Sequence, residues 1–118
     1  MQPIVRVSLG PAAPPHDVVL KLQGGDDWEL NVWATFDELA QLREIRSAVW
    51  ADRRAIAAGR SAGANVFWAA PSEGAPHAAT IMVGHDDESW DIALLVPVAQ
   101  VEEIGHRAAA GDVDHDYG

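Results

Sequence analysis

The sequence predicts an α+β fold in which two pseudo-repeated βββα units form one mostly antiparallel sheet, with one long and one short helix packed on one face. Three observations favour this fold. Apolar and β-branched stretches of strand length are separated by Gly, Pro and Asp. A helical pattern follows the third stretch, and the whole order occurs twice. At 118 residues, we expect a single domain over residues 1–118.

The first unit spans about residues 3–59 and contributes three strands. Period-two alternation and β-branched residues place them at 4–9, 17–23 and 27–33. Gly-Gly-Asp-Asp at 24–27 favours a hairpin turn, because glycine and aspartate tolerate the backbone angles that a tight turn needs.

A long helix is predicted over residues 36–59. Thr35 and Glu38 have the spacing of a capping box, in which each side chain satisfies an unpaired backbone N–H at the helix start. Gly59 is a residue type that often ends helices. The buried stripe is expected to comprise Leu42, Ile45, Val49 and Ile56.

The second unit is expected over residues 64–105 and repeats the order of the first. Its strands are predicted at 64–70, 78–84 and 90–96. A short helix is predicted over 98–105, after Pro97, a residue favoured where helices begin. When the two units are aligned, Pro15-His16 matches Pro76-His77, and Trp28 matches Trp90. We expect residues 106–118 to form a flexible acidic tail.

Alternate residues of a strand share a face, so the pattern also predicts orientation. Two sets are expected to point into the core: Trp28, Leu30 and Val32, and Trp90, Ile92, Leu94 and Val96. We expect at least one of Trp33, Phe67 and Trp68 on the sheet face that the helices leave open. An exposed aromatic patch of this kind is often a contact site.

The composition narrows the classes of partner. Eighteen acidic and eight basic residues give a net charge of −10, which repels nucleic acid and anionic membranes and attracts basic proteins. There is no cysteine, no recognisable signal peptide and no apolar run of membrane-spanning length, so we expect a cytoplasmic protein. The abundance of alanine and arginine is typical of a bacterial genome rich in G and C.

Two further groups are candidates for partner binding. Arg46, Trp50 and Arg54 are spaced four apart and are predicted to form one stripe on the long helix; Trp and Arg dominate interface hot spots. The predicted acidic turns carry Asp26, Asp27, Asp86, Asp87 and Glu88. With Trp33 and Phe67, these residues are the predicted contact set.

Motifs for catalysis are interpreted as loop residues. Gly-Arg-Ser-Ala-Gly at 59–63 matches a nucleophile elbow, but a predicted helix precedes it and a predicted strand follows it. His85 and its acidic neighbours stand on a predicted turn, and His16 and His77 on predicted loops. The Asp-rich tail at 112–118 lacks the closing glutamate of a calcium loop. We therefore predict no catalytic residue, cofactor or metal.

These observations lead to the hypothesis of a small acidic protein that masks a basic protein partner. It is similar in size, charge and predicted architecture to the immunity proteins that neutralise basic bacterial toxins, although no family motif supports the comparison. Two alternatives remain open. One is a small-ligand-binding protein or enzyme with an apolar cavity lined by Trp and His. The other is a homodimeric structural subunit.

Overall fold

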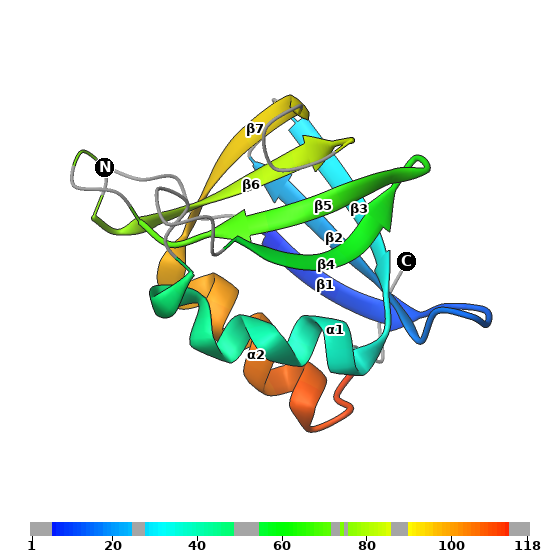
Figure 1. Ribbon diagram of the computed structural model, residues 1–118. Helices are drawn as coiled ribbons and strands as arrows, with labels where there is room; N and C mark the ends of the chain where they lie inside the picture. The colour runs from blue at the N-terminus through cyan, green and yellow to red at the C-terminus, as the bar shows by residue number, and fades with distance from the viewer. Residues whose placement is uncertain are drawn as a thin grey trace.

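The computed structural model describes residues 6–24, 28–48, 55–71, 74, 76–85 and 90–113. Its seven strands form one antiparallel sheet in chain order, and two helices lie on the same side of that sheet (Figure 1). The strands are β1 (Arg6–Pro11), β2 (Val18–Gly24), β3 (Trp28–Ala34), β4 (Ile56–Ser61), β5 (Ala64–Ala69), β6 (Ala78–Gly84) and β7 (Trp90–Pro97). The helices are α1 (Phe36–Ala40), which continues as the 3₁₀ helix η1 (Gln41–Ser47), and α2 (Val98–Ala109).

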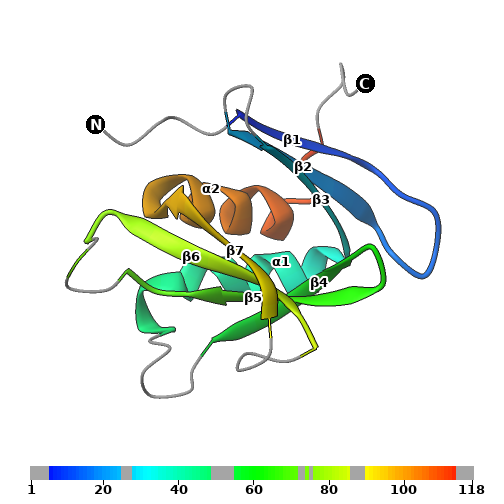
Figure 2. The same cartoon turned by 90° about the horizontal axis from the view of Figure 1, so that it is seen from above.

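The α+β class and the antiparallel sheet are confirmed, and all six predicted strands are present. Both predicted hairpins also form, since Gly24 pairs with Trp28 and Gly84 with Trp90. The sheet curves around the helices, so that β1–β3 and β6–β7 flank α2 (Figure 2). Among the described residues, no helix is long and apolar enough to cross a membrane.

The predicted long helix is wrong in its second half. The helix ends at Ser47, residues 49–54 lie outside the described part, and Ile56–Ser61 is the additional strand β4. Alanine has the highest intrinsic helix propensity, but tertiary contacts often override propensity, and here pairing with β5 does so. Ala62 and Gly63, both with positive φ, then form the two-residue turn between β4 and β5.

Gly59 belongs to β4 and does not end a helix. Its φ of +90° lies at a register shift between Ala57 and Arg60, where β4 approaches β3. A Cβ at Gly59 would lie 2.3 Å from Cγ1 of Val32. The two strands are joined in register at one pair, Trp33 and Arg60. Strands β3 and β4 can meet there because Gly59 has no side chain to clash with Val32.

The two predicted βββα repeats are not confirmed. Strand β4 begins inside the predicted first unit, where a helix was expected, and in the described part of the second unit no strand follows α2. The aligned residues Leu30 and Ile92 also lie in different environments, since Leu30 is buried and Ile92 is 46% exposed. The side chain of Trp90, which the repeat pairs with Trp28, lies outside what the structure describes.

The core lies between the concave face of the sheet and the helices. Trp68 is fully buried there, and its Nε1 donates a hydrogen bond to the carbonyl of Ala58 at 3.0 Å. The predicted orientation of β3 is confirmed, because Leu30 and Val32 are buried and Trp28 packs partly buried against them. Helix α1 supplies Leu39, and η1 supplies Leu42 and Ile45.

The prediction for β7 is wrong at Ile92. Val96 is buried and Leu94 partly buried, as expected, but Ile92 is exposed. A register shift between Val83 and Gly84 interrupts the pairing beside it, and β7 has a described neighbour on one side only. Alternation alone therefore does not determine burial at this sheet edge.

Helix α2 is longer than predicted and packs closely on η1. It extends to Ala109, and Val113 packs against the core, so the predicted flexible tail does not begin at residue 106. Gly105 lets the helices approach, since a Cβ there would lie 2.3 Å from the backbone nitrogen of Arg43. Arg46 of η1 pairs with Glu102 of α2 through two contacts of 2.9 Å.

Candidate docking surface

The convex face of the sheet carries an apolar surface that the helices leave uncovered. We call it the outer-face patch. It comprises Trp33, Phe67, Ala93 and Leu95, which are at least partly exposed, and Val19 and Met82, which are buried. Register places Val19 beside Trp33, and it places Phe67, Met82 and Ala93 in one row across three strands. Trp33 is 38% exposed and Leu95 is 53% exposed. These are two of the three large hydrophobic residues most exposed in the described part of the chain.

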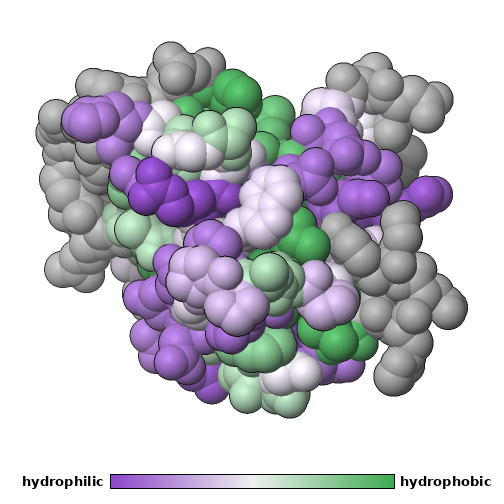
Figure 3. Space-filling view, turned by 90° about the vertical axis from the view of Figure 1, so that its right-hand side faces the viewer, coloured by the Kyte–Doolittle hydropathy of each residue, from purple (hydrophilic) through white to green (hydrophobic). Residues whose placement is uncertain are grey.

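Polar and cationic residues separate the two halves of this patch. Arg60 pairs in register with both Trp33 and Asn65, and its Nη2 donates to the carbonyl of Gly63 at 2.6 Å. Asn65 in turn donates to the carbonyl of His85. Viewed from the right of Figure 1, hydrophobic residues form small groups between hydrophilic ones (Figure 3).

The structure places Trp33 and Phe67 on the open face and Trp68 in the core, which confirms the expectation for this trio. Arg46 is not near them, because η1 lies on the helical side of the sheet and Arg46 is paired with Glu102. The predicted contact set is therefore divided between two sides of the molecule. Its other members lie outside the described residues: Asp26, Asp27, Trp50, Arg54, Asp86, Asp87 and Glu88.

Strand β7 adds an exposed apolar edge that the sequence analysis missed. We call Ile92–Val96 the β7 edge segment. It contains Ile92, Ala93, Leu94, Leu95 and Val96, of which Ile92, Ala93 and Leu95 are exposed. The sequence signal for this segment was the uncharged apolar run itself. Alternation predicts that one face of such a strand is buried, but it does not show whether the strand lies at an open sheet edge.

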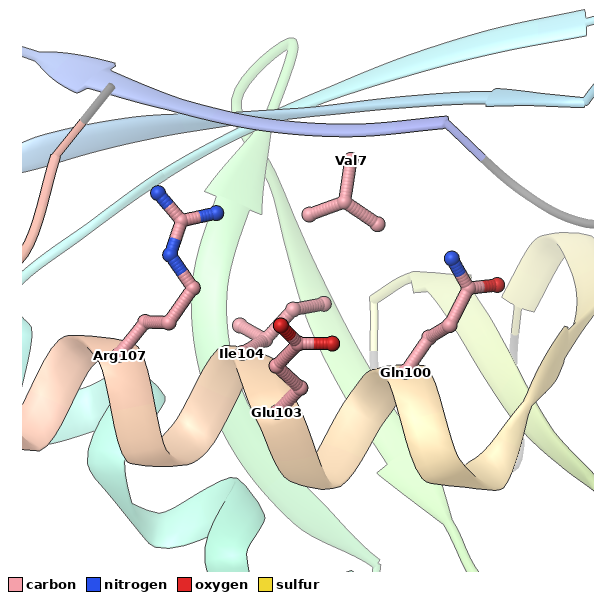
Figure 4. Close-up of a pocket in the computed structure, with 5 residues that line it drawn as sticks. All are labelled: Val7, Gln100, Glu103, Ile104 and Arg107. Carbon is pink, nitrogen blue, oxygen red and sulfur yellow. The ribbon is translucent and has the colours of Figure 1, made fainter. Parts of the chain in front are cut away.

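A hollow of about 190 Å³ lies between β1 and α2, on the helical side. Its lining combines Val7 and Ile104 with the polar side chains of Gln100, Glu103 and Arg107, which reach from α2 towards β1 (Figure 4). The guanidinium of Arg107 also contacts Asp112 at 3.5 Å. This lining contains neither Trp nor His and so differs from the apolar cavity of the ligand-binding alternative.

The remaining chemical motifs stay apart. The loops that carry His16 and His77 lie at opposite sides of the molecule in both Figure 1 and Figure 2. Ser61 pairs with Ala64 in a strand–turn–strand arrangement, which differs from the strand–turn–helix of a nucleophile elbow and also from the helix predicted before this segment. Over the described ranges, no group of three or more His, Asp or Glu residues is placed to hold a metal.

Comparison of this chain with protein families, with characterised proteins and with solved structures finds no match in any of the three.

Proposed function

We propose that this protein is a cytoplasmic binding protein that masks a basic protein partner, in the manner of an immunity-type inhibitor. The observation that carries the proposal is an exposed tryptophan on a helix-free sheet face of a chain whose net charge is −10. A single exposed aromatic residue would be unremarkable. Here Phe67, Ala93 and Leu95 continue the apolar surface on β5 and β7.

Charge and the outer-face patch have different roles in this proposal. The net charge of −10 draws a basic partner from a distance and raises the association rate. The patch then supplies the short-range contact, because a Trp side chain buries a large apolar area when water leaves it. Arg60, which lies between the two halves of the patch, favours a carboxylate of the partner there.

A role in binding another protein agrees better with the geometry than a role in binding a small ligand or in catalysis. The hollow beside Arg107 is small, and Asp112 contacts its guanidinium. Ligand pockets for drug-sized molecules usually have volumes of about 300–1,000 Å³. The outer-face patch, in contrast, has accessible apolar members on β3, β5 and β7.

The proposal is tested by affinity capture from source cells, using the full chain as bait. Trp33→Ala and the double variant Trp33→Ala/Phe67→Ala are compared with Ser47→Ala, an exposed control on η1. We expect one basic protein to be captured in stoichiometric amount by the wild type and by Ser47→Ala, with loss by the double variant. The captured protein is then purified, and its activity is measured while the wild-type chain is added back. Equal capture by all the variants, or a captured protein whose activity is unchanged, would contradict the proposal.

A further inference from the structure

The two edges of the sheet are protected differently. On the β1 edge, α2 lies alongside, and its side chains Gln100, Glu103 and Arg107 reach towards the strand (Figure 4). Strand β7 lies at the other end of the strand order and, in the part of the chain that the structure describes, pairs only with β6. In an antiparallel pair only alternate residues direct their N–H and C=O groups at the partner strand. The other residues of β7 direct theirs away from β6.

The β7 edge segment lacks the features that usually prevent strand addition. Natural edge strands carry lysine, proline or a bulge where another strand could pair. Here the register shift lies at Gly84, before the segment, and Pro97 follows it. The five residues between contain no charge, proline or glycine, and Leu95 is 53% exposed.

We infer that the β7 edge segment accepts an extended segment of the basic partner as an eighth strand of the sheet. This inference rests on the proposed function and gives its binding mode. Backbone groups of the added strand pair with those of β7. Its alternate apolar side chains extend the row of Phe67, Met82 and Ala93 on the outer face. The added strand thus joins the edge to the outer-face patch.

Charge selects the occupant. A second copy of the chain would bring a net charge of −10 against another of −10, and that repulsion opposes pairing. A cationic segment is instead attracted by the whole molecule, and the uncharged edge offers it no repulsive group. The fitting ligand is therefore an extended, cationic segment with apolar residues at every second position.

The test uses a synthetic nine-residue peptide of alternating valine and threonine with lysine at both ends, added to the full isotope-labelled chain. Amide hydrogen exchange is followed residue by residue. At a peptide concentration about ten times its Kd, exchange of open-edge amides in residues 92–96 should slow by about tenfold, because binding stabilises the closed strand. Exchange in β2, within the sheet, should remain unchanged. The same peptide with N-methylated backbone amides should have no effect.

Two charge variants locate the site. Leu95→Lys places a positive charge at the edge and should abolish the protection, as should Ile92→Lys, whereas Ser47→Lys makes the same charge change on exposed η1, away from β7, and should preserve it. Protection that persists in both edge variants, or that appears only around Trp33, would overturn the inference. So would a free wild-type chain that sediments as a dimer and becomes monomeric in Leu95→Lys, since a second copy would then occupy the edge.

Failure of this inference is distinguishable from failure of the proposed function. If Leu95→Lys retains the captured basic protein while Trp33→Ala/Phe67→Ala loses it, masking stands and strand addition is wrong. If the wild type captures no basic protein but the peptide protects residues 92–96, the edge accepts a strand and the masking proposal is wrong.

Discussion

The position of each aromatic residue decides whether it stabilises the fold or remains available for contact. Phe67 and Trp68 are neighbours in β5, yet Trp68 is fully buried and Phe67 lies on the outer face. Alternation predicts that the two side chains point apart. It cannot say which face the helices will cover, because that depends on how distant segments pack.

Replacement by phenylalanine should therefore destabilise the protein more at Trp68 than at Trp33. Trp68→Phe removes the indole N–H that pairs with the carbonyl of Ala58, and leaving that buried group unpaired should cost about 1–3 kcal/mol in the free energy of unfolding. Trp33→Phe, at an exposed site, should cost less than about 0.5 kcal/mol. Urea denaturation measures both. Equal losses would contradict the assigned faces.

Gly59 within β4 and Gly63 in the β4–β5 turn provide a second matched pair. Gly59 and Gly63 both have positive φ, at +90° and +83°, so alanine is strained at each. A Cβ at Gly59 would also clash with Val32, whereas nothing lies within 4 Å of one at Gly63. We expect Gly63→Ala to lower the melting temperature modestly and Gly59→Ala to lower it much further. Calorimetry checks the order, and the reverse order would contradict the β3–β4 junction.

At the scale of the element, local patterns located the strands better than the helices. The alternation of β2, β3 and β6 is clear in sequence, and the predicted bounds agree with the structure within one residue. The end of the first helix was mispredicted because residues such as Ala57 and Ala58 favour helix locally but pair with β5 in the fold. Strand β4 exists only through contacts with residues distant in sequence.

The start of α1 was predicted correctly and has an additional role. The backbone N–H of Thr35 donates to Oε1 of Glu38 at 2.9 Å, the hydroxyl of Thr35 accepts from the N–H of Glu38, and Oε2 of Glu38 accepts from the N–H of Gly59. The carboxylate therefore fixes both the helix start and β4.

Glu38→Ala should cost about 1–2 kcal/mol in the free energy of unfolding, since it removes a cap and a strand contact together. Asp37→Ala is the control, because Asp37 is exposed in the same turn and should cost less than about 0.5 kcal/mol. Chemical denaturation of the two variants compares them. A loss at Glu38 no larger than at Asp37 would show that the contact with β4 contributes nothing.

For the whole molecule, sequence predicted the sheet and the presence of an aromatic face, but not the curvature, β4 or the open β7 edge. The sequence placed Arg46 and Trp33 in one predicted contact set because each is a residue type that is common at interfaces. The fold separates them, since one lies on η1 and the other on the convex face of the sheet. Packing decides which of the candidate residues share a surface, and strand alternation does not predict that packing.

The overall charge predicts how a complex should respond to salt. With a net charge of −10, raising the ionic strength from about 0.01 M to 0.15 M shortens the screening length from about 30 Å to 8 Å. We expect the association rate with the basic partner to fall by about tenfold or more, while dissociation changes little. Trp33→Ala should instead make dissociation faster and change the association rate little. Stopped-flow mixing measures both rates, and an association rate insensitive to salt would contradict steering.

The central claim is that the convex sheet face of this acidic protein masks a basic partner. The most direct measurement is a titration of the partner's own activity with the wild-type chain and with Trp33→Ala/Phe67→Ala. The account predicts that the wild type abolishes activity near one equivalent, whereas the double variant requires a large excess. Equal inhibition by the two chains, or none by the wild type, would contradict it.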